Sequence, residues 1–167
     1  MRVRTLLVLM SVLALVVVAP EVAVAKAGGT ERPLKGSGSG TTTFDVASVP
    51  FPASGEGTAT LSHLGTASYS LNYVILPGAP GTFSVAGTGT FVAANGDELS
   101  VAFTGSGHDT SAATSETTVH VIVTGGTGRF QGADGTLTGT VITTTTSIVG
   151  TTVTADQTLT LDGSFSY

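Results

Sequence analysis

The chain has 167 residues and a formal net charge of −5, with 11 acidic side chains against 6 basic ones. It contains no cysteine, which excludes disulfide bonds, thiolate catalysis and cysteine-ligated metals. An acidic chain with so few basic residues is poorly suited to neutralise a phosphate backbone, which argues against nucleic acid and anionic membranes as partners.

The first 25 residues have the layout of a secretory signal peptide. Arg2 and Arg4 precede an apolar run over residues 5–18, and small residues at 23–25 provide a cleavage site before Lys26. The run is shorter than the roughly 20 residues that a membrane span needs, although a retained anchor is the alternative. We predict cleavage after Ala25 and a secreted, extracytoplasmic protein. Cleavage removes two basic residues and one acidic residue, which changes the net charge to −6.

The remaining chain predicts one domain after a short linker. Residues 26–40 are polar and rich in Gly and Ser, which is typical of a flexible lead-in. From residue 41 to residue 167, apolar residues alternate with polar ones, and no helical periodicity separates the runs. Strands are expected at about 41–49, 56–63, 66–76, 82–94, 98–107, 116–124, 135–148 and 152–167.

The pattern predicts an all-β fold, an antiparallel up-and-down β-barrel of about eight strands. Val119, Val121 and Val123 illustrate the alternation, which indicates strands with one buried face. Asn95-Gly96 predicts a hairpin through a type I′ turn, in which both central residues have positive φ. Closure would also protect Thr- and Gly-rich edges that carry few charges.

A glycine-rich segment, GGTGRFQGADG, lies between the sixth and seventh expected strands. It lacks the Lys-Ser/Thr pair and the following helix of a phosphate-binding loop, so a plain strand connection is one interpretation. The segment also resembles the signature of the allene oxide cyclase and dirigent barrel superfamily. The matching residues are Gly125, Gly126, Thr127, Gly128, Phe130, Ala133 and Gly135.

The resemblance implies an eight-stranded antiparallel barrel that binds an apolar substrate and needs no metal or organic cofactor. It also implies that identical chains could associate, because plant members are often trimers. The catalytic carboxylates and the pocket asparagine of the family do not align with this chain. The catalytic residues therefore stay unknown.

Three side chains are the candidates for ligand contact: His63, Tyr69 and Tyr73. His63 would share an inward strand face with Leu61, and the two tyrosines lie on one face of the next strand. Each could instead fill the core. The acidic residues are interpreted as solvated surface groups, and no pair of histidines has metal-ligand spacing.

Four functions are compatible with such a chain. We predict a protein that binds a small apolar molecule in the barrel, which requires a pocket of a few hundred Å³. The first alternative is a cofactor-free isomerase or cyclase, which requires a buried carboxylate or histidine at the base of the pocket. A barrel filled by its own side chains is the second, and an outer-membrane barrel is the third, disfavoured by 6% aromatic content.

Overall fold

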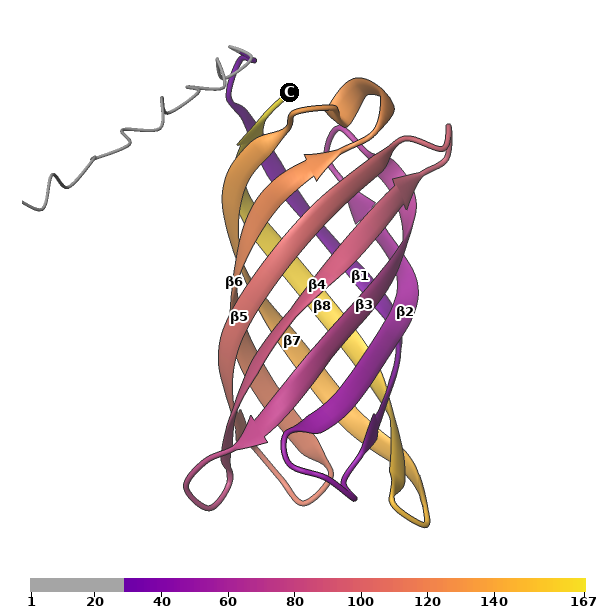
Figure 1. The fold of residues 1–167 in the computed structure, drawn as a ribbon, viewed down its shortest axis with the longest axis vertical. Helices are drawn as coiled ribbons and strands as arrows, with labels where there is room; N and C mark the ends of the chain where they lie inside the picture. Colours follow the sequence, from indigo (N-terminus) through magenta and orange to yellow (C-terminus); the bar gives the residue numbers. More distant parts are fainter. Residues whose placement is uncertain (1–28) are drawn as a thin grey trace, which may run out of the picture.

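The computed structural model describes residues 29–167, which form a barrel of eight strands (Figure 1). The predicted signal peptide and residues 26–28 lie outside the described part. The strands, with one short 3₁₀ helix between β6 and β7, are β1 (Arg32–Asp45), β2 (Phe51–Leu61), β3 (Gly65–Pro77), β4 (Thr82–Ala93), β5 (Glu98–Asp109), β6 (Thr114–Gly126), η1 (Gly128–Phe130), β7 (Asp134–Val149) and β8 (Thr152–Ser166).

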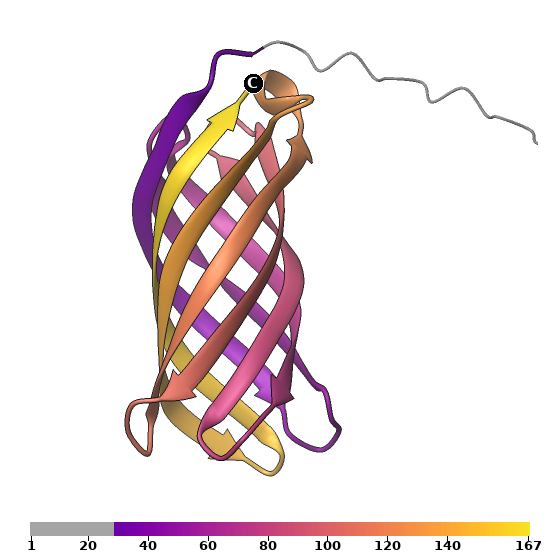
Figure 2. The same ribbon diagram turned by 90° about the vertical axis from the view of Figure 1, so that its left-hand side faces the viewer.

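Every strand pairs with its neighbours in the sequence, and β1 closes the sheet against β8. All eight pairings are antiparallel, which confirms the predicted up-and-down barrel. The strands cross the barrel at a steep tilt, as closure of eight strands requires (Figures 1 and 2). Among the described residues, no helix is long and apolar enough to cross a membrane.

The alternating residues face the interior, as the sequence pattern predicted. Val119, Val121 and Val123 are all buried, while His120 and Ile122 between them are exposed. Leu99 and Val101 of β5 and Leu159 and Leu161 of β8 are buried in the same way, and they belong to one continuous core. Removal of this apolar face from water is the main driving force for closure.

The predicted flexible lead-in is wrong over residues 32–40, because these residues form the first part of β1. Leu34 is fully buried, and the stretch pairs with both β2 and β8. Its glycines alternate with Ser and Lys, so the inward face is flat and side chains of β2 lie directly over it. A Cβ on Gly36 would stand 2.7 Å from Leu61 Cδ2. The Gly- and Ser-rich composition of residues 32–40 therefore resembles that of a linker, although the segment is a strand.

Strand β2 starts earlier than predicted, at Phe51, even though Pro52 would be expected to exclude a strand. The ladder between β1 and β2 ends at the pair Phe44 and Ala53, so Pro52 pairs with β3 alone. A proline is tolerated where one side of the strand is unpaired. The Asn95-Gly96 hairpin is confirmed, but the type I′ turn is wrong, because only Gly96 has positive φ.

The η1 segment lies at one end of the barrel (Figure 1). Phe130 is fully buried, with its ring 6.0 Å from that of Phe165 and 5.2 Å from that of Tyr167. Gly128 has φ of +56°, and a Cβ there would collide with the Asp97 carboxylate in the β4–β5 hairpin. Arg129 Nε lies 3.4 Å from Asp97 Oδ2. The glycine-rich segment is thus a plug tied to the adjacent hairpin.

Candidate functional site

The opposite end of the barrel is hollow and holds a cavity of about 510 Å³. Its wall is mostly apolar and comes from inward side chains, most of them half-buried because they face the cavity. The apolar wall residues are Phe44, Phe51, Leu71, Ile75, Phe83, Val85, Phe103, Val119 and Val141. This volume lies within the range of small-molecule sites.

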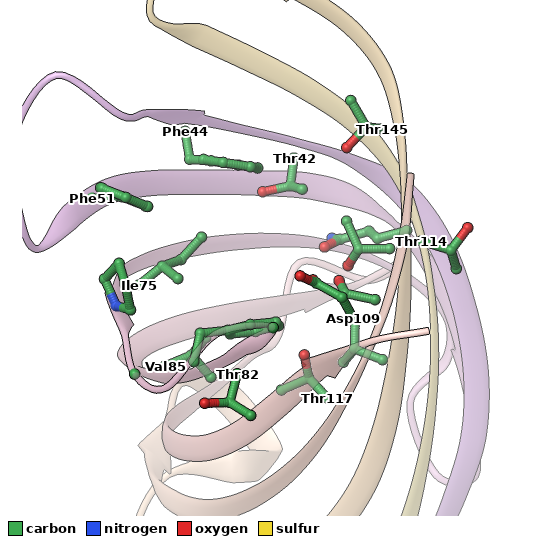
Figure 3. Close-up of a pocket in the computed structure, with 18 of the residues that line it drawn as sticks. Thr42, Phe44, Phe51, Ile75, Thr82, Val85, Asp109, Thr114, Thr117 and Thr145 are labelled. Atoms are coloured by element: carbon green, nitrogen blue, oxygen red, sulfur yellow. The ribbon is translucent and has the colours of Figure 1, made fainter. Parts of the chain in front are cut away.

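Two loops form the rim of the cavity. The β3–β4 loop provides Pro77 to Thr82, and the β5–β6 loop provides residues 111–113 beside Asp109. In the close-up, Thr42, Ile75 and Thr117 come from three different strands and surround the same space (Figure 3). Asp109 at the rim is exposed and is the acidic residue in the lining.

Below the cavity, a row of four paired residues crosses β3, β2, β1 and β8. Tyr69 pairs with Gly57, Gly57 with Gly40, and Gly40 with Gln157. The Tyr69 side chain lies across the two glycines, and its hydroxyl accepts a hydrogen bond of 2.9 Å from Gln157 Nε2. A Cβ on Gly40 or Gly57 would approach that hydroxyl to 2.5 or 2.6 Å, so both positions require glycine. Tyr69 and Gln157 are 3% and 4% exposed.

A second polar pair lies next to this row. The hydroxyls of Tyr73 and Thr42 are 2.6 Å apart, and Thr42 Oγ1 is also 2.9 Å from the carbonyl oxygen of Ser54. Burial raises the pKa of Tyr73, and the pKa of Tyr69 is raised for the same reason. Both tyrosines therefore stay neutral at ordinary pH. Together, Thr42, Tyr73 and Gln157 form the polar floor of the cavity.

The floor offers hydrogen-bonding groups without charge. None of the described carboxylates or histidines is buried, so the acid–base group that the enzyme hypothesis requires at the base of the pocket is absent there. Among the described residues, no three side chains of His, Asp or Glu come together as a metal site. The arrangement can bind and orient a neutral molecule through shape, apolar contact and hydrogen bonds.

The three predicted ligand contacts have different outcomes. Tyr73 lines the cavity, and Tyr69 lies beneath the floor and holds Gln157. The predicted inward position of His63 is wrong, because β2 ends at Leu61 and His63 occupies the exposed β2–β3 turn with φ of 69°. This turn is at the plugged end, where the His63 ring lies 6.1 Å from that of Phe165.

Sequence reasoning missed Gln157, although the sequence carries a signal for it. Val153, Ala155, Leu159 and Leu161 form the inward face of β8, and Gln157 lies in phase with them. A polar residue in such a series is buried, and a buried amide needs a partner. Its partner, Tyr69, is 88 positions away in the sequence, so the pattern could identify the residue but not its contact.

The fold and the cavity define a class of protein: a closed antiparallel β-barrel, plugged at one end and hollow at the other. A solved structure of the pterocarpan synthase dirigent protein is similar, with a TM-score of 0.42 and 17% identity over 83% of this chain and 93% of that chain. No protein-family model matches the chain, and no curated protein matches it either. Membership of the allene oxide cyclase and dirigent superfamily stays a prediction.

Proposed function

We propose that this protein binds a small, predominantly apolar molecule in the hollow end of its barrel. One observation carries the proposal: a cavity of about 510 Å³ with an apolar wall and an uncharged polar floor. An apolar molecule gains free energy by leaving water for such a wall, at roughly 25 cal/mol per Å² of buried apolar surface. The polar floor then fixes the orientation of the molecule.

A barrel filled by its own side chains explains one end of the molecule but not the other. The end beneath η1 is packed with large side chains, of which Phe130, Phe165 and Leu34 are at most 1% exposed. The hollow end also has large apolar side chains pointing inward, among them Phe44, Phe83 and Phe103, yet they leave space between them. We also propose that the chain is exported after cleavage behind Ala25, so that it would meet its ligand outside the cytoplasm.

The proposal is tested with a pair of substitutions on β3. Leu71 faces the cavity and neighbouring Ser70 is exposed, so Leu71→Trp would fill the cavity and Ser70→Trp would not. A neutral fluorescent apolar dye, N-phenyl-1-naphthylamine, is titrated into the purified wild-type protein and into both variants. We expect saturable binding to wild type and Ser70→Trp, and binding at least ten-fold weaker to Leu71→Trp.

Two results would contradict the proposal. One is the absence of saturable binding to the folded wild-type protein. The other is equal binding by the two tryptophan variants, which would place the dye outside the barrel. Circular dichroism of each variant establishes that the barrel is intact.

A further inference from the structure

The hydrogen bonds of the floor restrict what kind of molecule the cavity accepts. This inference rests on the proposed function and concerns the ligand's chemical class. It follows from which protons of Tyr73, Thr42 and Gln157 are already used within the protein. Each group that has used its proton can face a ligand only as an acceptor.

The proton of the Tyr73 hydroxyl is committed to Thr42. Thr42 Oγ1 has one proton, and the Ser54 carbonyl oxygen at 2.9 Å can only accept. The bond of 2.6 Å between Thr42 and Tyr73 therefore forms with the tyrosine as donor. Tyr73 thus presents oxygen lone pairs to the cavity and no proton.

Gln157 complements this acceptor. Its Nε2 donates to the Tyr69 hydroxyl, which leaves Oε1 and the second N–H of the amide. Oε1 accepts no hydrogen bond from the protein within residues 29–167. Every side-chain oxygen that is buried in this part of the chain has a partner, so Oε1 is not buried and is open to the cavity. The Thr117 hydroxyl can rotate to donate or to accept, and so it does not alter the preference.

Charged ligands find no partner at the floor. The basic residues of the described chain are Arg32, Lys35 and Arg129, which all lie at the plugged end. The acidic residue of the lining, Asp109, lies at the rim. A carboxylate or an ammonium group buried at the floor would lose its hydration without gaining a counter-ion, which is strongly unfavourable.

We propose that the cavity selects neutral molecules with an apolar body and a hydroxyl group at the inner end. The hydroxyl donates its proton to Tyr73, and its oxygen accepts from the free N–H of Gln157. An ether of the same size accepts the second bond but leaves the Tyr73 oxygen without a donor. An unmet buried acceptor weakens binding.

The test compares ligands that differ in one group. 1-Decanol, its isomer 1-methoxynonane and decanoate each displace N-phenyl-1-naphthylamine from the wild-type protein at pH 7. We expect 1-decanol to bind about five- to ten-fold more tightly than the ether, and decanoate to bind at least ten-fold more weakly than the alcohol. Equal affinities for alcohol and ether, or tightest binding by decanoate, would overturn the inference.

Two variants test the assignment of the Tyr73 proton. Thr42→Val keeps the shape of the side chain and frees the Tyr73 proton, so the ether should gain and the preference should fall to two-fold or less, or reverse. Tyr73→Phe removes the acceptor, so 1-decanol should fall to the affinity of the ether. An unchanged preference in either folded variant would overturn the inference.

The same titrations separate the two proposals. Displacement of the dye by the ether as effectively as by the alcohol leaves the binding function in place and removes the hydroxyl preference. Failure of the dye itself to bind the wild-type protein removes both.

Discussion

Tyr69 and Gln157 are joined by a hydrogen bond that crosses two strands bearing glycine at the points of crossing. The bond links β3 to β8 through the interior, so it connects strands that are not neighbours in the sheet. It holds the Gln157 amide in place at the base of the cavity. Tyr69, which lies below the floor, thereby controls the orientation of Gln157, which is part of the floor.

We expect Tyr69→Phe to lower the free energy of unfolding by about 1–3 kcal/mol, because the Gln157 amide would be left buried without its partner. Gln157→Leu should lower it by a similar amount. The double variant should lose less than the sum, because no unmet polar group remains. Urea unfolding of the four proteins measures this coupling, and strictly additive losses would contradict it.

The tyrosines also give the stability a dependence on pH. Burial raises the pKa of both Tyr73 and Tyr69 above the value of about 10 that a tyrosine has in the unfolded chain. The folded state therefore keeps protons that the unfolded state releases, and stability falls as the pH rises above about 10. Their contribution is fully present below that pH.

Urea unfolding between pH 8 and pH 11 tests this dependence. The free energy of unfolding should be level at first and then decline, and the decline should be smaller in Tyr73→Phe. A decline of equal size in the variant would assign the effect to other groups.

At the scale of single elements, β1 shows how sequence composition and structure diverge. Residues 32–40 have the composition of a linker, because Gly alternates there with Ser and Lys, yet they form a strand. Strong apolar alternation in β5, β6 and β8 was sufficient to predict those strands and their buried faces. The inward glycines of β1 have no side chain, so the signal on which the prediction depends is absent there.

Two truncations test the role of β1. A chain that begins at Arg32 keeps the whole strand, whereas one that begins at Thr41 loses nine residues of pairing with β8. We expect the first to unfold cooperatively and the second to expose two open edges and to aggregate. Size-exclusion chromatography and circular dichroism distinguish them. A monomeric, folded barrel from the shorter chain would restore the linker interpretation.

The η1 plug is a second element that the sequence revealed only in part. The glycine-rich segment stands out in the sequence, but its function as a plug depends on the contacts of Phe130 with Phe165 of β8 and with Tyr167. The contact depends on how the barrel closes, and local sequence does not encode that. The cavity floor could not be predicted for the same reason, since it joins residues of β1, β3 and β8.

We expect Phe130→Ala to lower the free energy of unfolding by about 3–5 kcal/mol, because the side chain is fully buried and its loss leaves a void. Arg129→Ala is the neighbouring control. Its ion pair with Asp97 is partly exposed, so the loss should stay below about 1 kcal/mol. Thermal and urea unfolding measure both, and similar losses in the two variants would contradict the assignment of the plug.

At the scale of the whole molecule, the two ends of the barrel differ in chemistry. The plugged end carries Arg32, Lys35 and Arg129 together with the aromatic cluster. The hollow end carries loops with exposed aliphatic residues, among them Val49 and Val149. Because the plug closes the other end, ligand exchange should proceed through the hollow end alone.

Hydrogen exchange with and without N-phenyl-1-naphthylamine tests this polarity. We expect the dye to slow exchange in residues 78–81 and 111–113 at the rim and to leave residues 127–133 of the plug unchanged. Slower exchange confined to the plug would place the entrance at the other end.

The start of β1 and the end of β8 are paired with each other, Arg32 with Phe165, and both lie at the plugged end (Figures 1 and 2). A tether attached before β1 or after β8 would therefore hold the molecule by its base. The cavity would then face away from the support. The barrel could be immobilised on a sensor chip or fused to a carrier through either terminus. Its cavity would then point away from the attachment and stay accessible to molecules in solution.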